Sequence, residues 1–329
     1  MNLSENDFNM PQSDLIPTRA MGFLLVDGFS LLSYASAVEP LRAANTLAGK
    51  PLYSWSTLTV GDVPTQSSSG LPIASDSAMS GEQDYDTVFV CSAGNPAAFG
   101  DKPTLTWLRG LARRGVRLAG VSGGPFVLAR AGLLEGHRCT IHWEHVPAFE
   151  AAFPALDLRR TLFEIDRDRL TCGGGVAALD MMHALITLDH GPALAGAVSD
   201  WFLQTEVRFG GGAQRMSLRE RHGTSNAKLL RALELMEGHL DEPPSRAKLA
   251  QAAGVSLRQL ERLFAAHLGT SVEKHGLQLR LEHAHLLLAQ TTLSILEISV
   301  ACGFASASHF SRRYKARYGI NPSAERKAG

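Results

Sequence analysis

The segment Gly120–Gly124 (GVSGG) places a serine between glycines where an apolar run ends and a helix is predicted to begin. Serine hydrolases expose a nucleophile on this kind of sharp strand-to-helix turn. Pro125 suits the first turn of a helix, because its missing N–H has no partner there. The free N–H groups at the start of such a helix also favour an anion. The segment therefore predicts a nucleophile or an anion site at Ser122, with Gly123 beside it.

Catalysis by Ser122 would also require a base that is oriented by an acid. His142, in the segment CTIHWEH, is the candidate base and is predicted at the end of a short strand, but the sequence assigns no carboxylate to it. Asn95, after a predicted strand, and Trp143, beside His142, are further candidates for a pocket. A structural histidine and a ring packed in the core are the alternatives for His142 and Trp143. We therefore favour a pocket that binds without catalysis, and an amidase or hydrolase with Ser122 as nucleophile is the alternative.

Short apolar runs alternate with longer helical patterns between about Arg19 and Arg208. The predicted strands are 21–26, 53–60, 86–93, 116–122 and 169–175, and the predicted helices are 30–49, 103–115, 125–134 and 176–191. Strands that are apolar throughout and separated by helices predict a mostly parallel sheet covered on both faces. Such a sheet binds ligands at the carboxyl ends of its strands, where Ser122 is predicted to lie.

One helix-turn-helix pattern occurs twice in the last hundred residues. In each copy a glycine makes the turn, Gly254 or Gly303, and a serine, Ser256 or Ser306, precedes the second helix as its N-cap. The apolar residues predicted to pack these helices are Leu249, Ala253, Leu260, Leu263 and Phe264 in the first copy, and Ile295, Ile298, Val300, Phe310 and Tyr314 in the second. This pattern predicts an all-α domain that binds DNA.

The outer faces of the two second helices are polar and basic. A solvated surface is the alternative for any one of these residues, but second helices of such units place side chains in the major groove, where arginine often contacts guanine. The predicted DNA contacts are Arg258, Gln259 and Arg262 in the first unit and Ser308, Arg312 and Arg313 in the second.

The two turn glycines lie 49 residues apart, with a predicted helix at Ser271–Ala289 between them. Recognition helices on one face of B-DNA must lie about 34 Å apart. A helix of roughly 18 residues is about 27 Å long, which is the right scale to hold two such units on adjacent groove segments.

The charge distribution also divides the chain, although the whole has a formal net charge of zero. Residues 224–329 hold 14 Lys and Arg against 9 Asp and Glu, whereas residues 1–209 hold 15 against 22. The basic part is expected to face phosphate. We predict a disordered tail at 1–18, a ligand-binding domain at 19–208, a linker at 209–224 and the DNA-binding domain at 225–329.

The four cysteines have no paired spacing, so the sequence predicts neither a metal site nor a disulfide framework. No cofactor is predicted. The first residues are acidic and polar, unlike a signal peptide, and no apolar run approaches the roughly 20 residues needed to cross a bilayer. We expect a cytoplasmic protein.

Residues Asn226–Ala328 resemble the AraC-type DNA-binding domain, whose signature matches the segment from Ile295 through GFASASHFSRRYK to GINPS. Residues Arg19–Gly191 resemble the DJ-1/PfpI-like, class I glutamine amidotransferase-type domain, a flavodoxin-like fold. Catalytic members carry a cysteine at the elbow and, in one branch, a glutamate from the first helix. Here the elbow residue is Ser122, and Ser33 stands where that glutamate would be.

The combination of the two domains resembles AraC-family transcriptional regulators of the GlxA type. The resemblance implies that the first domain senses a small metabolite, of the amino acid or quaternary amine class, and that the second binds promoter DNA. It further implies an activator, with RNA polymerase as a partner. A homodimer joined through the first domain is also expected, with Leu31, Leu32 and Tyr34 as a candidate contact.

Overall fold

The N-terminal domain is built on a six-stranded sheet with the strand order β2-β1-β5-β6-β10-β9. The computed structural model of the chain describes residues 17–79, 84–291 and 293–328. The strands are β1 (Arg19–Leu25), β2 (Tyr53–Thr59), β5 (Thr87–Ser92), β6 (Arg117–Ser122), β9 (Phe163–Asp166) and β10 (Arg169–Cys172). All neighbouring pairs are parallel except β9 with β10. The five predicted strands and the mostly parallel sheet are confirmed, and the antiparallel edge strand β9 is an addition.

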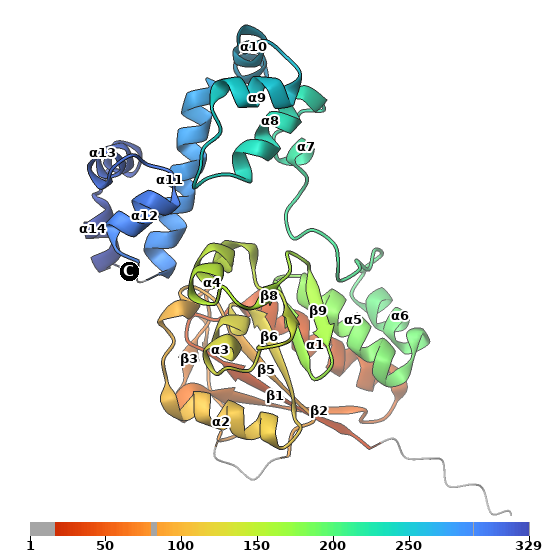
Figure 1. The fold of residues 1–329 in the computed structure, drawn as a ribbon. Helices are drawn as coiled ribbons and strands as arrows, with labels where there is room; N and C mark the ends of the chain where they lie inside the picture. The colour runs from red at the N-terminus through yellow and green to blue at the C-terminus, as the bar shows by residue number, and fades with distance from the viewer. Residues whose placement is uncertain (1–16, 80–83, 292, 329) are drawn as a thin grey trace, which may run out of the picture.

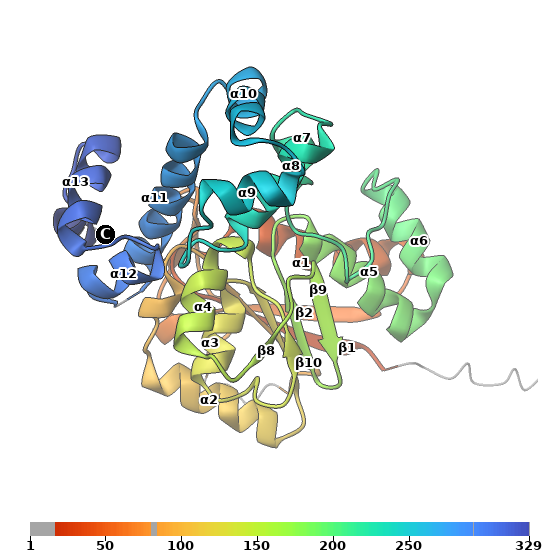
Figure 2. The ribbon, with the colours of Figure 1, turned by 45° about the horizontal axis from the view of Figure 1, so that its top comes forward.

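Helices cover both faces of this sheet (Figures 1 and 2). One face packs on α1 (Leu31–Ala48), α5 (Ala177–His190) and α6 (Pro192–Trp201). The other face packs on α2 (Lys102–Arg113), α3 (Gly124–Arg130) and α4 (Val146–Ala152). Two apolar cores therefore sandwich the strands, which explains why the strands are apolar on both faces.

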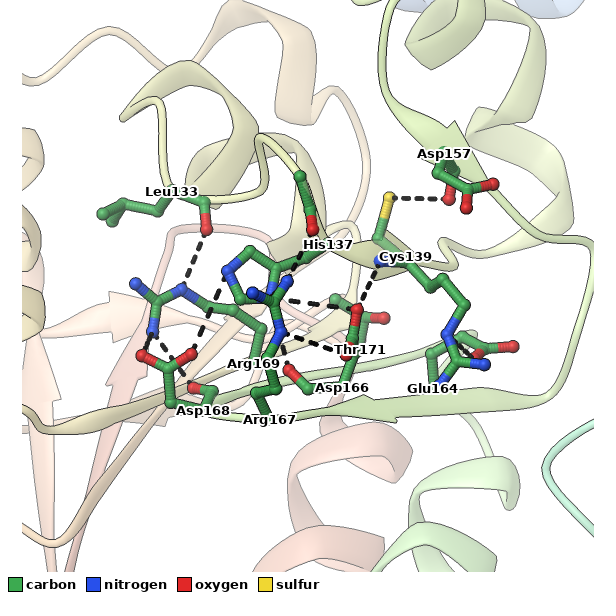
Figure 3. A network of polar contacts seen from close by, with 12 residues as sticks. Leu133, His137, Cys139, Asp157, Glu164, Asp166, Arg167, Asp168, Arg169 and Thr171 are labelled. Carbon is green, nitrogen blue, oxygen red and sulfur yellow. Dashed lines mark hydrogen bonds and ion pairs between the residues drawn. The ribbon is translucent and has the colours of Figure 1, made fainter.

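Short elements connect the layers. They are η1 (Val60–Asp62), β3 (Thr65–Gln66), β4 (Pro72–Ile73), η2 (Pro96–Ala98), β7 (Arg138–Cys139), η3 (Trp143–His145) and β8 (Asp157–Leu158). The polar network in Figure 3 fixes β7. The Arg138 N–H donates to Asp166 Oδ2 at 2.8 Å, and the Cys139 thiol donates to the Asp157 carbonyl at 3.8 Å. The prediction that His142 ends a strand was wrong, because β7 ends at Cys139 and His142 is instead the N-cap of η3.

The elbow after β6 depends on two glycines. A Cβ added to Gly120 would lie 2.6 Å from the Pro125 nitrogen, and one added to Gly124 would lie 1.9 Å from the Val90 carbonyl oxygen. Between them Ser122 has φ +60°, in the left-handed region. The start of α3 can approach β5 and β6 this closely only because these two positions lack side chains.

The C-terminal domain consists of helices around two small cores. The helices are α8 (Ala227–Glu237), α9 (Arg246–Ala253), α10 (Leu257–Leu268), α11 (Val272–Gln290), α12 (Ile295–Ala301), α13 (Ala307–Tyr318) and α14 (Pro322–Ala328). Each core belongs to one predicted helix-turn-helix unit, and α11, the predicted connecting helix, contributes to both. Val300 was predicted to pack α12 but is 63% exposed, because Ile298 and Ser299 face the core instead.

A segment with little regular structure joins the domains, and it contains the short helix α7 (Leu218–Arg221) within the linker predicted at 209–224. A capping box at Ser217 starts α7. The connecting helix α11 lies against α4, η2 and η3 of the N-terminal domain. Of the tail predicted at 1–18, residues 1–16 lie outside the described residues. In the described ranges, no helix is long and apolar enough to span a membrane, and no cluster of His, Cys, Asp and Glu could hold a metal ion.

The elbow packing predicts that Gly120→Ala destabilises the N-terminal domain. The new methyl group would meet the Pro125 backbone, so we expect a loss of about 1 to 3 kcal/mol in the free energy of unfolding. Denaturant unfolding followed by circular dichroism measures it. The control is Gly110→Ala inside α2, where the nearest atom is 3.9 Å away, and it should be neutral or stabilise by up to about 1 kcal/mol. Equal effects of the two substitutions would contradict the argument.

Candidate functional site

Ser33 and Ser122 meet at the carboxyl end of the sheet. A Cβ built on Gly174 would lie 2.5 Å from Ser122 Cβ and 2.7 Å from Ser33 Oγ, so both serines pack against that glycine. Ser33 Oγ accepts the Gly175 N–H at 2.7 Å and donates to Ser30 Oγ at 2.9 Å, which fixes its orientation. Both serines are buried. The cluster therefore contains hydroxyl groups where catalytic relatives carry a thiol and a carboxylate.

The first amide of the elbow is not free to hold an anion, contrary to the prediction for Gly123. Its N–H donates to the Ser92 carbonyl at 2.7 Å. Ser92 pairs with Ser122 across β5 and β6, and its buried hydroxyl has no partner among the described residues. Asn95 is exposed just beyond, and its neighbour Pro96 lies against Gly123. Ser92 was missed because a serine within an apolar strand gives no sequence signal for a site.

His142 adjoins the elbow through its backbone and is uncharged. Its N–H donates to the Ser122 carbonyl at 3.2 Å, and its Nδ1 accepts the Glu144 N–H at 3.4 Å. Burial, helped by the nearby His145, lowers the pKa of His142 to about 4. Because the ring is neutral near pH 7, the 3.8 Å separation between Nδ1 and Glu144 Oε2 is not an ion pair at that pH. Lowering the pH would charge the ring only well below neutrality.

The arrangement lacks the parts of a hydrolase. Ser122 Oγ donates to no base within the described residues, and the Glu144 carboxylate lies too far from His142 to orient it by a hydrogen bond. The nearby Cys172 is fully buried, and burial raises the pKa of its thiol to about 12. A thiol with that pKa is not a nucleophile near neutral pH. The described residues at the elbow do not assemble a nucleophile, a base and an acid.

Trp143 contacts the linker between the domains. Its ring is 40% exposed, and the Arg215 guanidinium lies 4.7 Å from the ring centroid. The cation over this indole is therefore supplied by the chain itself. A cavity of about 690 Å³ lies beside the ring, between the domains, and Glu282 and Tyr318 line its other side.

The predicted DNA contacts all lie exposed on α10 and α13. Figure 1 shows these two helices on the outside of the C-terminal domain, away from the sheet. Ser256 and Ser306 cap them as predicted. Gln259 is partly engaged, because its Oε1 accepts the Ser256 N–H at 3.1 Å. The six residues are Arg258, Gln259 and Arg262 on α10, and Ser308, Arg312 and Arg313 on α13.

The basic side chains on these helices have few partners. Arg313 Nε contacts His309 Nε2 at 3.3 Å. Arg258, Arg262 and Arg312 form no ion pair within the described part of the chain. Unpaired guanidinium groups on the second helix of each unit can reach phosphates or base edges without first losing a protein partner. The fold and this surface define a DNA-binding protein of two domains, one α/β and one helical.

Comparisons with known proteins agree with this class. Residues 20–187 match the DJ-1/PfpI family, and residues 249–328 match a helix-turn-helix domain. The chain is 47% identical over 316 residues to the HTH-type transcriptional regulator GlxA of Rhizobium meliloti, covering 96% of this chain and 98% of that one. It is 43% identical over 304 residues to the HTH-type transcriptional regulator CdhR of Pseudomonas aeruginosa, covering 92% and 90%.

The N-terminal domain also resembles a solved structure, an AraC family transcriptional regulator from Pseudomonas putida. The two are 26% identical with a TM-score of 0.51, covering 56% of this chain and 99% of that one. The chain belongs to the family of HTH-type transcriptional regulators that join a DJ-1/PfpI domain to an AraC-type DNA-binding domain. It is therefore a DNA-binding transcriptional regulator and not an enzyme.

Arg262 and Arg312 are predicted to contact base edges from separate helices. Each substitution by alanine should cost about 1 to 3 kcal/mol in DNA binding and relax the preference at a different half of the site. Footprinting and binding assays on a duplex selected by the wild-type protein measure this. Arg113→Ala on α2 is the control, since Arg113 is an exposed arginine of the other domain. If both substitutions weaken binding to all sequences equally, these arginines contact phosphate only.

Proposed function

We propose that this regulator is an activator whose N-terminal domain binds a small metabolite at the Ser122 elbow. The observation that carries the proposal is the grouping of Ser33, Ser122 and His142 at the carboxyl end of the sheet, without the base and acid that hydrolysis needs. Open α/β sheets bind ligands at this edge. A strained turn kept without its chemistry suits recognition of a ligand.

The effector is proposed to be an amino acid or a quaternary amine with its carboxylate near Ser122. The Ser122 hydroxyl can donate to a carboxylate. His142 can donate from Nε2, because its Nδ1 accepts the Glu144 N–H and the ring is neutral. Asn95, exposed in the adjoining turn, offers an amide in place of the Gly123 N–H that is already bonded.

The remaining partners follow from the class of protein. We propose that effector binding changes either the affinity for promoter DNA or the contact with RNA polymerase. We also propose a cytoplasmic location. The four cysteines, at 91, 139, 172 and 302, are free and buried, which fits a reducing compartment.

Replacing the elbow hydroxyl tests the pocket. A thermal-shift screen of amino acids and methylated amines first identifies a ligand, because a compound at 100 times its Kd adds about 2.7 kcal/mol of stability. Ser122→Ala should then weaken that ligand by about 1 to 3 kcal/mol in calorimetry, since it removes a hydrogen bond to a charged group. Ser68→Ala, an exposed serine after β3, is the matched control and should bind normally. Equal affinity of the two variants would remove Ser122 from the site.

The same two proteins, wild type and Ser122→Ala, also test the alternative function, an amidase or hydrolase with Ser122 as nucleophile. Incubation with amide and ester substrates should give no turnover above background. Turnover that disappears in Ser122→Ala would instead establish the hydrolase alternative.

We propose a homodimer through α1. Of the three residues predicted at the contact, Leu31 and Tyr34 pack into the domain core, whereas Leu32 is 56% exposed. Leu32→Glu should therefore give a monomer in light scattering at micromolar concentration, where the wild type gives a dimer, because a charge at an apolar contact is costly to bury. Leu71→Glu, at a leucine of similar exposure next to β4, is the control. A monomeric wild type, with and without DNA, would contradict the proposal.

A further inference from the structure

The side chain of Gln214 in the linker forms hydrogen bonds with residues next to His142. Gln214 Oε1 accepts the backbone N–H of Trp143 at 2.7 Å. Gln214 Nε2 lies within hydrogen-bond distance of three oxygens: Thr140 Oγ1 at 3.0 Å, the Ile141 carbonyl at 2.9 Å and the Thr161 carbonyl at 2.6 Å. These partners are 53 to 74 residues away along the chain. The linker therefore has a specific attachment at this point.

The attachment surrounds the pocket residues on two sides. Its partners Ile141 and Trp143 are the two chain neighbours of His142. The Gln214 amide also lies against Gly173, where an added Cβ would come within 2.8 Å of Gln214 Cδ. The next residue, Gly174, is the one that packs on Ser33 and Ser122. A shift of His142 or Gly174 would therefore move the partners of Gln214.

The linker carries this attachment directly into the first helix-turn-helix unit. Arg215, the residue after Gln214, covers the Trp143 ring. Two residues later Ser217 begins α7, and Arg221 at the end of α7 makes a two-bond ion pair with Glu237 of α8, at 2.8 and 3.1 Å. Helix α8 packs in the core of the first unit.

The segment that follows His142 is also attached to the second helix-turn-helix unit. His145 Nδ1 and Gln290 Oε1 form a hydrogen bond of 3.0 Å. Both residues are buried, with 2% and 4% of their surface exposed. Gln290 is the last residue of α11, whose C-terminal half packs in the core of the second unit.

We propose that residues His142–His145, the relay segment, transmit effector occupancy to the placement of the DNA-binding domain through Gln214 and Gln290. The inference rests on the proposed function of the elbow pocket. Because Gln214 bonds to both chain neighbours of His142 and Gln290 bonds to His145, a ligand that displaces His142 loosens both attachments together. Gln214 and Gln290 are positioning residues that act through the relay segment.

Coupling between the two attachments tests the proposal in the full-length protein, without any ligand. Gln214→Ala should speed hydrogen exchange at the C-terminal end of α11 as well as in the linker, and Gln290→Ala should speed exchange in residues 210–216 as well as in α11. Each variant should also change the affinity for a duplex selected by the wild type by about five-fold or more, with the double variant close to the singles.

The matched control is Gln204→Ala, a glutamine near the end of the N-terminal domain, just before the linker. Gln204 Nε2 donates to Asp180 of α5 at 2.7 Å, and within the described residues Gln204 forms no hydrogen bond with the relay segment, so its loss should leave exchange in α11 and DNA affinity unchanged. Should Gln214→Ala perturb folding, Gln290→Ala alone still decides, because it leaves the N-terminal domain intact. The relay is contradicted if hydrogen exchange changes only beside each mutated residue. It is also contradicted if the effects of Gln214→Ala and Gln290→Ala on DNA affinity add up in the double variant.

The outcome is separable from that of the pocket itself. Calorimetry on Ser122→Ala tests the pocket, whereas exchange and DNA binding by the glutamine variants need no effector. If the two attachments are coupled but the affinity for the ligand is unchanged in Ser122→Ala, only the proposed pocket is contradicted. If the two attachments are not coupled but Ser122→Ala weakens ligand binding, only the relay is contradicted.

Discussion

The close approach of α3 to β5 and β6 is the constraint on which the Ser122 elbow depends. Gly124 has no side chain because the Val90 carbonyl occupies the place where its Cβ would stand. Ser122, two residues earlier, lies in the left-handed region, a conformation that costs of order 1 to 3 kcal/mol. The backbone of His142 bonds to Ser122, and Gly174 packs on it, so both neighbouring segments take their positions from the strained turn.

Among the described residues, the contacts of Ser122 and Ser33 involve no charged group. Ser122 and Ser33 are neutral, and burial keeps His142 uncharged near pH 7. A buried carboxylate or thiolate would need a partner to offset its desolvation, whereas hydroxyl groups need only hydrogen bonds. Such a site can hold a polar ligand by donating hydrogen bonds to it, and it does not activate the ligand.

Local patterns in the sequence predicted most of the fold, and long-range contacts explain what they missed. The parallel strands are apolar on both faces, and the caps and turn glycines of the helix-turn-helix units lie a few residues from what they cap. Strand β9 is half-buried and carries two acids, so it has no such pattern. Gln214 reaches partners 53 to 74 residues away, and nothing near it in the sequence marks it. The predicted roles of the pocket residues and of the DNA contacts stay predictions.

The connecting helix limits how regulation can act. Val272 at the start of α11 packs in the first core, and Leu281 and Leu288 pack in the second, so one helix of 19 residues sets the separation of the two units. Changing that separation would require breaking one of the cores, which is costly compared with a few hydrogen bonds. Attachment of the C-terminal domain to the N-terminal domain involves such bonds at Gln214 and Gln290, together with contacts of α11 with α4, η2 and η3. A small ligand, whose differential binding energy is limited, can therefore shift the placement of the DNA-binding domain far more readily than its internal geometry.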